Sequence, residues 1–397
     1  MHLFSPLPPE TYSLLDSLPA LIDKTLPLPG RFRAALSANV AELSRLLTSN
    51  RGERSLSYLG RPDMLSAYLR YFLPWNLYRL CRLLPGLELN LAGGDVITDL
   101  GCGPLTLVLA LWISRPDLRD LPLEFYCIDH SGPALEAGKK IFAALAGGSS
   151  PWNLHVKKES IDTRANTQKH SAVKAKPAAL VCAVNVLNEM CGDLPHSDTE
   201  GLRRKALNIA RILHGFASAS ASILAVEPGV PQSGQFISLL RSAFLELKRP
   251  PLSPCTHTAA CPMPGGFEAR GKREKKRWCH FAFETDDAPK DLHRLSGAAG
   301  IPKERAVLSF LLAGPIAADT HGTEKNAPQK TPLRIISDGF PLPQNRFGRY
   351  GCSKQGLVLL TGEKGLIEET ASGALINPLL SADGQRDSKS GALLAEL

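Results

Sequence analysis

Two cysteines stand six positions apart in the stretch PPLSPCTHTAACPMPGG, residues 250–266. Cys255 and Cys261 lie in a segment too rich in proline and glycine to form a helix or a strand. Cysteine thiolates bind zinc and iron–sulfur clusters, and metal binding can order a loop that has no hydrophobic core of its own. We therefore interpret this stretch as a candidate metal loop.

Two further cysteines lie outside the regular elements, Cys279 in RWCHFAF and Cys352 in GRYGCSKQG. Together the four thiols suit either zinc or an iron–sulfur cluster. The C-x5-C spacing differs from the C-x2-C spacing of structural zinc sites and favours iron–sulfur. His257 and His280 stand beside these cysteines as substitute ligands or outer neighbours. The alternative interpretation is four unrelated thiols.

Other cysteines fall inside apolar runs, where an unpaired cysteine behaves as a small buried hydrophobic residue. We expect core packing for Cys81, Cys102, Cys127 and Cys182, whereas Cys191 fits neither group.

A glycine turn follows an apolar run in ITDLGCGPLTLVLAL, with Asp99, Gly101 and Gly103 just before a helical segment. Glycines there let the backbone approach a ligand, and the helix N-terminus offers free N–H groups. The next predicted strand ends at Asp129, where a nucleoside-binding α/β fold holds the ribose hydroxyls. This pattern resembles the S-adenosylmethionine site of class I methyltransferases. Leu105 departs from the usual third glycine, and we expect it to weaken or abolish cofactor binding.

Two later strands end in polar residues, at NVLNEM and VEPG. Asn185, Asn188, Glu189 and Glu227 are expected at the carboxyl edge of the sheet, where open α/β folds bind ligands, or as loop caps. We assign Asn185 and Glu227 to the cofactor site. The sequence lacks an N/D-P-P-Y tetrapeptide and a suitably placed Pro-Cys pair, so it assigns no catalytic residue.

The order of apolar patterns predicts the fold class. Strand-like runs alternate with helical ones from Val96 onward, which predicts an α/β fold with a mostly parallel, Rossmann-like sheet. The resemblance of its glycine turn implies the class I methyltransferase type. A helical lead-in precedes this core, and a cysteine-bearing loop module is inserted in it. The predicted divisions are 1–92 (helical region), 93–249 (α/β core), 250–285 (metal loop with a basic insertion), 286–365 (remaining core strands, including the fourth cysteine) and 366–397 (weakly ordered tail).

Composition narrows the class of protein. The chain has 397 residues, a net charge of +8 and a hydrophobic fraction of 44%. It has no apolar run long enough for a membrane span, and its start matches neither a secretion signal nor a transit peptide. We expect a cytoplasmic, monomeric protein with no membrane partner and no disulfides. The positive charge favours a polyanionic partner.

Seven motifs occur in one order along residues 55–362: YLGRPDMLSAYLRYFLPWNLYR, DLGCGP, VNVLNEM, VEPGVPQSG, PCTHTAACP, WCHF and RYGCSKQG. This set resembles the methyltransferase-like mitochondrial ribosomal small-subunit assembly factors and their bacterial relatives. The resemblance implies a class I methyltransferase fold with a four-cysteine iron–sulfur site of the 4Fe-4S type, bound to the small ribosomal subunit and its rRNA. It implies that Cys255, Cys261, Cys279 and Cys352 are the cluster ligands, with zinc as the alternative metal.

A basic insertion, EARGKREKKR, separates Cys261 from Cys279. In this family context its cations are expected to contact rRNA phosphates, whereas an isolated run of this kind is usually a solvated loop. The predicted RNA-binding residues are Arg270, Lys272, Arg273, Lys275, Lys276 and Arg277.

Three functions follow from these patterns. The first is a small-subunit assembly factor that has a methyltransferase-like fold, an iron–sulfur cluster and rRNA contacts. The second is an active S-adenosylmethionine-dependent rRNA methyltransferase that binds its cofactor through Asp99, Gly101, Gly103 and Asp129. The third is a small-molecule methyltransferase with a zinc loop, which leaves the basic insertion unexplained.

Overall fold

The computed structural model describes residues 3–48, 58–161, 176–190, 198–263, 278–317, 329–380 and 384–397. The chain divides into two compact units. We call residues 4–192 and 284–306 the N-terminal unit, and residues 1–3, 193–283 and 307–397 the C-terminal unit. Among the described residues, no helix is both long and apolar enough to cross a bilayer.

Helices fill the first part of the N-terminal unit. They are α1 (Pro9–Thr25), α2 (Gly30–Ala34), α3 (Leu36–Thr48), α4 (Pro62–Ala67) and α5 (Leu73–Leu83), with the π-helical turn η3 (Tyr68–Phe72) between the last two. Pro74 lies at the start of α5, where a missing N–H costs little because the first amides of a helix have no intrahelical acceptor.

A parallel sheet carries the glycine turn of the N-terminal unit. Its strands run in the order β3 (Asn153–Lys158), β2 (Glu124–Asp129), β1 (Val96–Leu100) and β4 (Ala178–Val184). β1 pairs in parallel with β2 and with β4, and β2 pairs in parallel with β3. Asp99 stands in register with Cys127 on one side and Cys182 on the other. The predicted α/β class with a mostly parallel sheet is confirmed.

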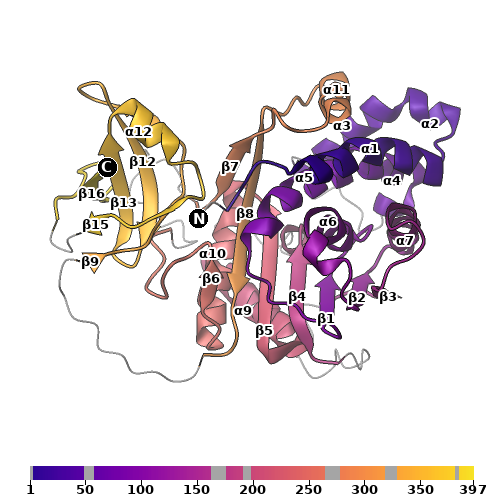
Figure 1. Cartoon of the computed structure of the whole chain (residues 1–397), viewed down its shortest axis with the longest axis horizontal. Helices are drawn as coiled ribbons and strands as arrows, with labels where there is room; N and C mark the ends of the chain where they lie inside the picture. The colour runs from indigo at the N-terminus through magenta and orange to yellow at the C-terminus, as the bar shows by residue number, and fades with distance from the viewer. Residues whose placement is uncertain are drawn as a thin grey trace. The chain divides into compact units, whose positions relative to one another are not determined.

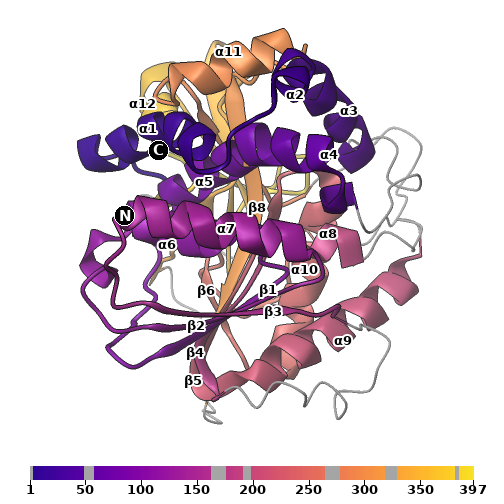
Figure 2. The same ribbon diagram turned by 90° about the vertical axis from the view of Figure 1, so that its right-hand side faces the viewer.

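Two helices cover this sheet. The helix α6 (Thr106–Ser114) is buried on nearly every side, as its continuous apolar run requires, and α7 (Gly132–Leu145) begins at Ser131, whose hydroxyl accepts from the Ala134 amide. Figure 2 shows α6 and α7 above β1 to β3, and α1 packs on both helices. The N-terminal helices therefore form an outer layer over the sheet of their own unit.

The C-terminal unit begins with α9 (Thr199–Phe216), β5 (Ala217–Pro228) and α10 (Pro231–Glu246). β8 (Arg305–Ala313) pairs antiparallel with β5 and with β6 (Pro251–Ser253), and β7 (Phe281–Glu284) also pairs with β8. Residues 305–313 thus add an antiparallel strand beside β5.

Arg249 joins these elements from the turn between α10 and β6. Its side chain is fully buried and donates to His214 Nδ1 at 2.9 Å and to the carbonyl oxygens of Ala221, Gly314 and Ser218. Four partners therefore compensate the cost of burying this cation.

A second sheet departs from the prediction that residues 286–365 complete the core sheet. Its strands β10 (Leu333–Ile335), β12 (Arg346–Ser353) and β13 (Gly356–Gly362) pair with one another in that order, with β11 (Phe340–Leu342) beside β12. They enclose their own apolar cluster, which includes Leu333, Val358 and Leu360. Figure 1 shows these strands in yellow.

The expected weakly ordered tail is also corrected. Residues 366–397 contribute the end of α12 (Lys364–Glu369), then β14 (Leu375–Ile376), β15 (Leu379–Leu380) and β16 (Leu393–Glu396). β16 pairs in parallel with β13, and β15 pairs with β9 (Gln329–Lys330). Leu393 is buried in the apolar cluster, so a few apolar residues order a segment whose overall composition suggested otherwise.

Candidate functional site

The ends of β1 and β2 bring the predicted cofactor residues of the N-terminal unit together. Asp129 accepts hydrogen bonds from the amides of Gly103 (2.9 Å) and Ser131 (2.8 Å), one at each carboxylate oxygen. Gly101 donates its amide to the carbonyl of Ile128 at 2.8 Å. The carboxylate of Asp129 therefore fixes the glycine turn and retains lone pairs for a hydroxyl donor.

Asp99 lies on β1, just before this turn. Its side chain is buried, and neither carboxylate oxygen has a hydrogen-bond partner among the described residues. Burial, together with the charge of Asp129, raises the pKa of Asp99 to about 8. A cationic donor that reaches a buried acid of this kind would stabilise its charged form.

Leu105 takes the place of the third glycine without entering an open cavity. It adopts a left-handed conformation with φ 57° and is fully buried. A β-carbon added at Gly138 of α7 would lie 2.8 Å from Leu105 Cγ, so the leucine side chain packs against that glycine. The expectation that Leu105 weakens or abolishes cofactor binding stays a prediction.

Only glycine fits at position 101, because the Val186 side chain lies against its backbone. A β-carbon at this position would lie 2.3 Å from Val186 Cγ2, in the loop after β4. The short helix α8 (Leu187–Met190) follows this loop. Asn185 directly after β4 is left-handed with φ 57°, a conformation that asparagine tolerates.

The remaining predicted strand-end residues are divided between the units. Asn188 and Glu189 lie on α8 of the N-terminal unit, where Glu189 accepts from the Tyr58 hydroxyl at 3.3 Å. Glu227 is fully buried on β5 of the C-terminal unit.

Tyr68 is a residue that the sequence did not single out. It begins the π-helical turn η3, and its hydroxyl accepts from Asn76 Nδ2 at 3.5 Å. Burial raises the pKa of Tyr68, and the charges of Glu189 and Asp129 add to this effect. A helix of the lead-in thus brings a phenol close to the glycine turn. The sequence YLRYF does not indicate that Tyr68 lies near the glycine turn. The π-helical turn itself is a structural signal, since such turns are frequent at functional sites.

The four cysteines predicted as ligands all belong to the C-terminal unit and influence one another. Burial raises the pKa of Cys279 well above its usual value, and the charges of Cys255, Cys261 and Cys352 raise it further. Burial likewise raises the pKa of Cys352, with further contributions from Cys255 and Cys261. His257 Nε2 lies 3.3 Å from Cys352 Sγ. The four cysteines come from three separate segments of the chain.

Two buried arginines hold the cysteine loop. Arg241 of α10 donates from Nη2 to the carbonyls of His257 and Ala259, at 2.8 Å each. Arg334 of β10 donates to the carbonyl of Pro254 at 3.1 Å and stands in register with Cys352. Hydrogen bonds from cations thus fix a loop that proline and glycine keep out of helices and strands.

Coordination geometry is a separate matter. Within the described ranges, no group of three or more His, Cys, Asp or Glu side chains is arranged to hold a metal ion. Charge effects extend further than coordination bonds, so the thiols can influence one another without forming a closed shell. The iron–sulfur or zinc site at these four cysteines stays a prediction.

Other predicted residues have simpler outcomes. Core packing is confirmed for Cys81, Cys102, Cys127 and Cys182, all of which are buried. Cys191 lies outside the described residues, as do the predicted RNA-binding residues Arg270, Lys272, Arg273, Lys275, Lys276 and Arg277.

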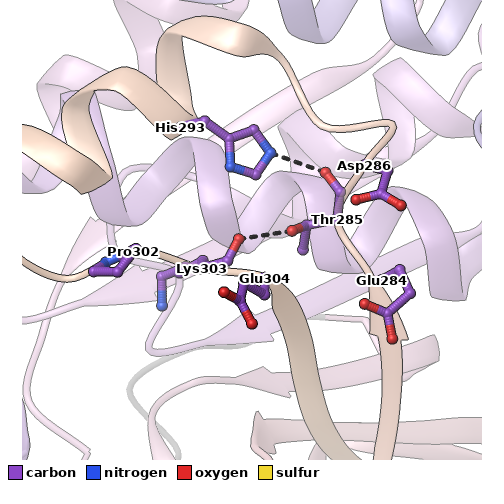
Figure 3. A pocket seen from close by; sticks show the side chains of 7 residues that line it. All are labelled: Glu284, Thr285, Asp286, His293, Pro302, Lys303 and Glu304. Carbon is purple, nitrogen blue, oxygen red and sulfur yellow. Dashed lines mark hydrogen bonds between the residues drawn. The ribbon is translucent and has the colours of Figure 1, made fainter.

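A cavity of about 400 Å³ opens elsewhere in the N-terminal unit. Its lining includes Glu284, Asp286, His293 and Lys303, and the Lys303 ammonium group points away from the carboxylates of Glu284 and Asp286 (Figure 3). Burial, together with the charge of Arg79, lowers the pKa of Lys303 to about 8.

A family model described as mitochondrial small ribosomal subunit Rsm22 matches residues 98–337, more than half of the sequence. Among curated proteins, none matches.

Similar solved structures are methyltransferases of low sequence identity. A putative class I S-adenosylmethionine-dependent methyltransferase from Listeria monocytogenes has 11% identity and a TM-score of 0.35, covering 80% of this chain and 90% of its own. Geranyl diphosphate C-methyltransferase from Streptomyces coelicolor has 12% identity and a TM-score of 0.30, covering 70% of this chain and 98% of its own. TM-scores this low assign no activity to the present chain.

Proposed function

Because the chain belongs to the Rsm22 family, described as mitochondrial small ribosomal subunit, we propose that it is an assembly factor of the small ribosomal subunit. In this proposal a methyltransferase-like fold binds rRNA, and an iron–sulfur cluster orders the cysteine loop. The family description names the mitochondrion, whereas the sequence predicted the cytoplasm, and the cytoplasmic location stays a prediction.

The observation that supports the proposal is the pair of buried arginines, Arg241 and Arg334, that donate hydrogen bonds to backbone carbonyls beside Cys255. In this proposal Cys255, Cys261, Cys279 and Cys352 would hold the cluster. Four thiolates around a cluster leave a net negative charge, and Arg241 and Arg334 would supply positive charge nearby. Burial raises the pKa of Cys279 and the charges of the other thiols raise it further, so a bound metal would be needed to stabilise the deprotonated ligand.

The predicted RNA contacts follow from the position of the basic run. Arg270 to Arg277 lie between Cys261 and Cys279, so ligation of both cysteines would fix both ends of that segment. Phosphate contacts from arginine and lysine give affinity with little sequence preference and weaken as salt rises.

Metal analysis of anaerobically purified protein tests the cluster. We expect iron and acid-labile sulfide in equal amounts, with both lost in Cys352→Ser and retained in Cys182→Ser, whose cysteine is buried outside the site. Zinc in place of iron would keep the ligand set and reject the iron–sulfur assignment. Absence of any metal from the wild-type protein would reject both.

Co-sedimentation tests the ribosomal role. The protein is expected to travel with isolated small subunits at low salt and to dissociate as salt increases. A protein that stays free at every salt concentration would contradict the assembly role, whatever its metal content.

An S-adenosylmethionine-dependent rRNA methyltransferase is the second candidate, and the unpartnered carboxylate of Asp99 favours it. The donor set suits a cationic nucleoside: Asp99 for positive charge, Asp129 for ribose hydroxyls, and Gly101 and Gly103 for close backbone approach. Asn185 and Glu227 are the further predicted contacts. When bound, the cofactor supplies a transferable methyl group, and no residue of this chain is assigned to the transfer step.

Cofactor affinity should depend on pH in a defined direction. Asp99 has a pKa of about 8, so it is mostly neutral below that pH and must lose its proton to pair with a cation. Affinity for S-adenosylmethionine is therefore expected to rise up to about tenfold per unit as pH increases toward 8, and to level off above it. Calorimetry at several pH values, with Asp99→Asn as control, measures this. No detectable binding at any pH would remove the methyltransferase candidate.

A further inference from the structure

The helix α9 (Thr199–Phe216) has an apolar flank and a cationic flank. Leu202, Ile209 and Leu213 are buried, and the helix packs against α10 and β5. On the opposite flank Arg203, Arg204 and Arg211 are exposed, with Lys205 half-buried beside them. Figure 2 shows α9 in full along one margin of the strands of its unit.

Three exposed arginines of this chain have an acidic partner. Arg33 lies 3.3 Å from Asp23, Arg61 lies 2.7 Å from Asp63, and Arg294 pairs with Asp291. By contrast, in the part of the chain that the structure describes, no carboxylate lies within 4.0 Å of the four α9 cations. The positive charge of this flank therefore attracts an anionic partner.

The chemistry of this flank fits a phosphate backbone better than a protein surface. Three of the four cations are arginines, whose planar guanidinium groups bind phosphate oxygens in pairs. Protein interfaces usually centre on large apolar or aromatic anchors. The large exposed hydrophobic residues among the described positions lie elsewhere: Leu252, Ile316, Leu366, Leu379 and Leu397. Arg204 and Arg211 stand two turns apart, about 10 Å along the helix axis, which is enough to reach more than one phosphate.

We propose that the exposed flank of α9 binds the phosphate backbone of RNA through Arg203, Arg204 and Arg211. This inference rests on the proposed function, and it adds an RNA-contacting surface separate from the basic run that ends at Arg277. Such contacts would position the RNA without reading its sequence.

Two triple variants test the inference at equal net charge. The first is Arg203→Gln with Arg204→Gln and Arg211→Gln. The control is Arg33→Gln with Arg61→Gln and Arg294→Gln, which removes three exposed arginines that already have acidic partners. Binding of a fluorescein-labelled RNA duplex is measured over a range of salt concentrations. The slope of log affinity against log salt is expected to fall in magnitude by about 2 to 3 in the α9 variant and to stay near wild type in the control.

Each other outcome has a distinct meaning. Equal slopes for wild type and both variants would overturn the α9 surface while leaving the proposed function intact. Equal losses in both variants would show a response to net charge and would also overturn it. Loss of small-subunit binding with unchanged duplex binding would replace RNA by an acidic protein partner. A wild-type protein that binds neither the duplex nor the subunit would overturn the inference together with the proposed function.

A folding control keeps the test decisive. Circular dichroism and the thermal midpoint are compared for wild type and both variants. If the triple α9 variant is unfolded, the single Arg204→Gln replaces it, with an expected slope change of about 1. A folded single variant with the wild-type slope would then count against the surface.

Discussion

The two candidate sites differ in how each treats a buried charge. In the N-terminal unit Asp99 is buried with no hydrogen-bond partner for either carboxylate oxygen among the described residues. In the C-terminal unit Arg241 and Arg334 are also buried, and each donates to backbone carbonyls. An unpartnered buried charge costs stability until a ligand arrives, whereas a hydrogen-bonded one stabilises the loop it contacts. The first site is therefore suited to binding a ligand, whereas the buried charges of the second stabilise its own loop.

The largest expected effect concerns Asp99. Its pKa of about 8 exceeds the ordinary value of 3.8, so the native state retains a proton that the unfolded chain loses between those pH values. Stability is therefore lost as pH rises from about 4 to 8. At pH 8 the free energy of unfolding of Asp99→Asn is expected to exceed that of wild type by up to about 5 kcal/mol, and this difference should shrink toward pH 4. Urea unfolding at several pH values measures it. A less stable variant at pH 8 would show that the carboxylate has a partner.

Substitution of Arg241 should lower the free energy of unfolding, whereas substitution of Asp99 should raise it. Arg241→Met leaves the carbonyls of His257 and Ala259 without donors, and we expect a loss of about 2 to 4 kcal/mol in urea unfolding. The exposed Arg204→Met serves as the control and should change stability by less than about 0.5 kcal/mol. If Arg241→Met matches that control, the arginine does not support the loop.

Lys303 gives a smaller test of the N-terminal unit. Its pKa is lowered from 10.5 to about 8, so the native state is penalised below pH 8 and regains stability as pH rises toward 10.5. Lys303→Met is expected to be more stable than wild type at pH 7 by about 1 kcal/mol, because part of the penalty is screened by solvent, and to be similar above pH 10. Chemical unfolding at both pH values measures this, and a constant difference would contradict the pKa assignment.

His214 provides the smallest test, in the C-terminal unit. Burial lowers the pKa of His214, and the charge of Arg249 lowers it further, so the unfolded chain takes up a proton first as pH falls. The stability it contributes is present above the ordinary value of 6.5 and declines below it, by less than about 1 kcal/mol for this half-buried group. His214→Asn should flatten the stability profile between pH 5 and 7. An unchanged profile would mean that His214 does not titrate in this range.

The sequence predicted contiguous features well and distant ones poorly. Asp99, Gly101 and Gly103 lie within five residues, so the apolar strand before them and the helical run after them were enough to predict the turn. The sequence does not show that Gly138 leaves room for the side chain of Leu105.

The same contrast applies to the cysteine site. Its thiols could be selected by elimination and by resemblance, but Arg241 and Arg334 could not. They belong to α10 and β10, and only the tertiary fold brings their guanidinium groups to the carbonyls of residues 254–259. The second sheet was missed for a related reason, since short apolar runs do not indicate which strands pair. Tyr68 was missed because its relevance depends on a π-helical turn.

Arg249 has a consequence for how the C-terminal unit folds. Its donors are satisfied by His214, Ser218, Ala221 and Gly314, which lie up to 65 residues from it in the chain. A folding intermediate with β5 formed but residue 314 still distant would bury a guanidinium with one partner missing, a state of high free energy. The arginine thus penalises half-assembled forms of the sheet edge, so α9, β5, and the end of β8 should form and melt together rather than one at a time.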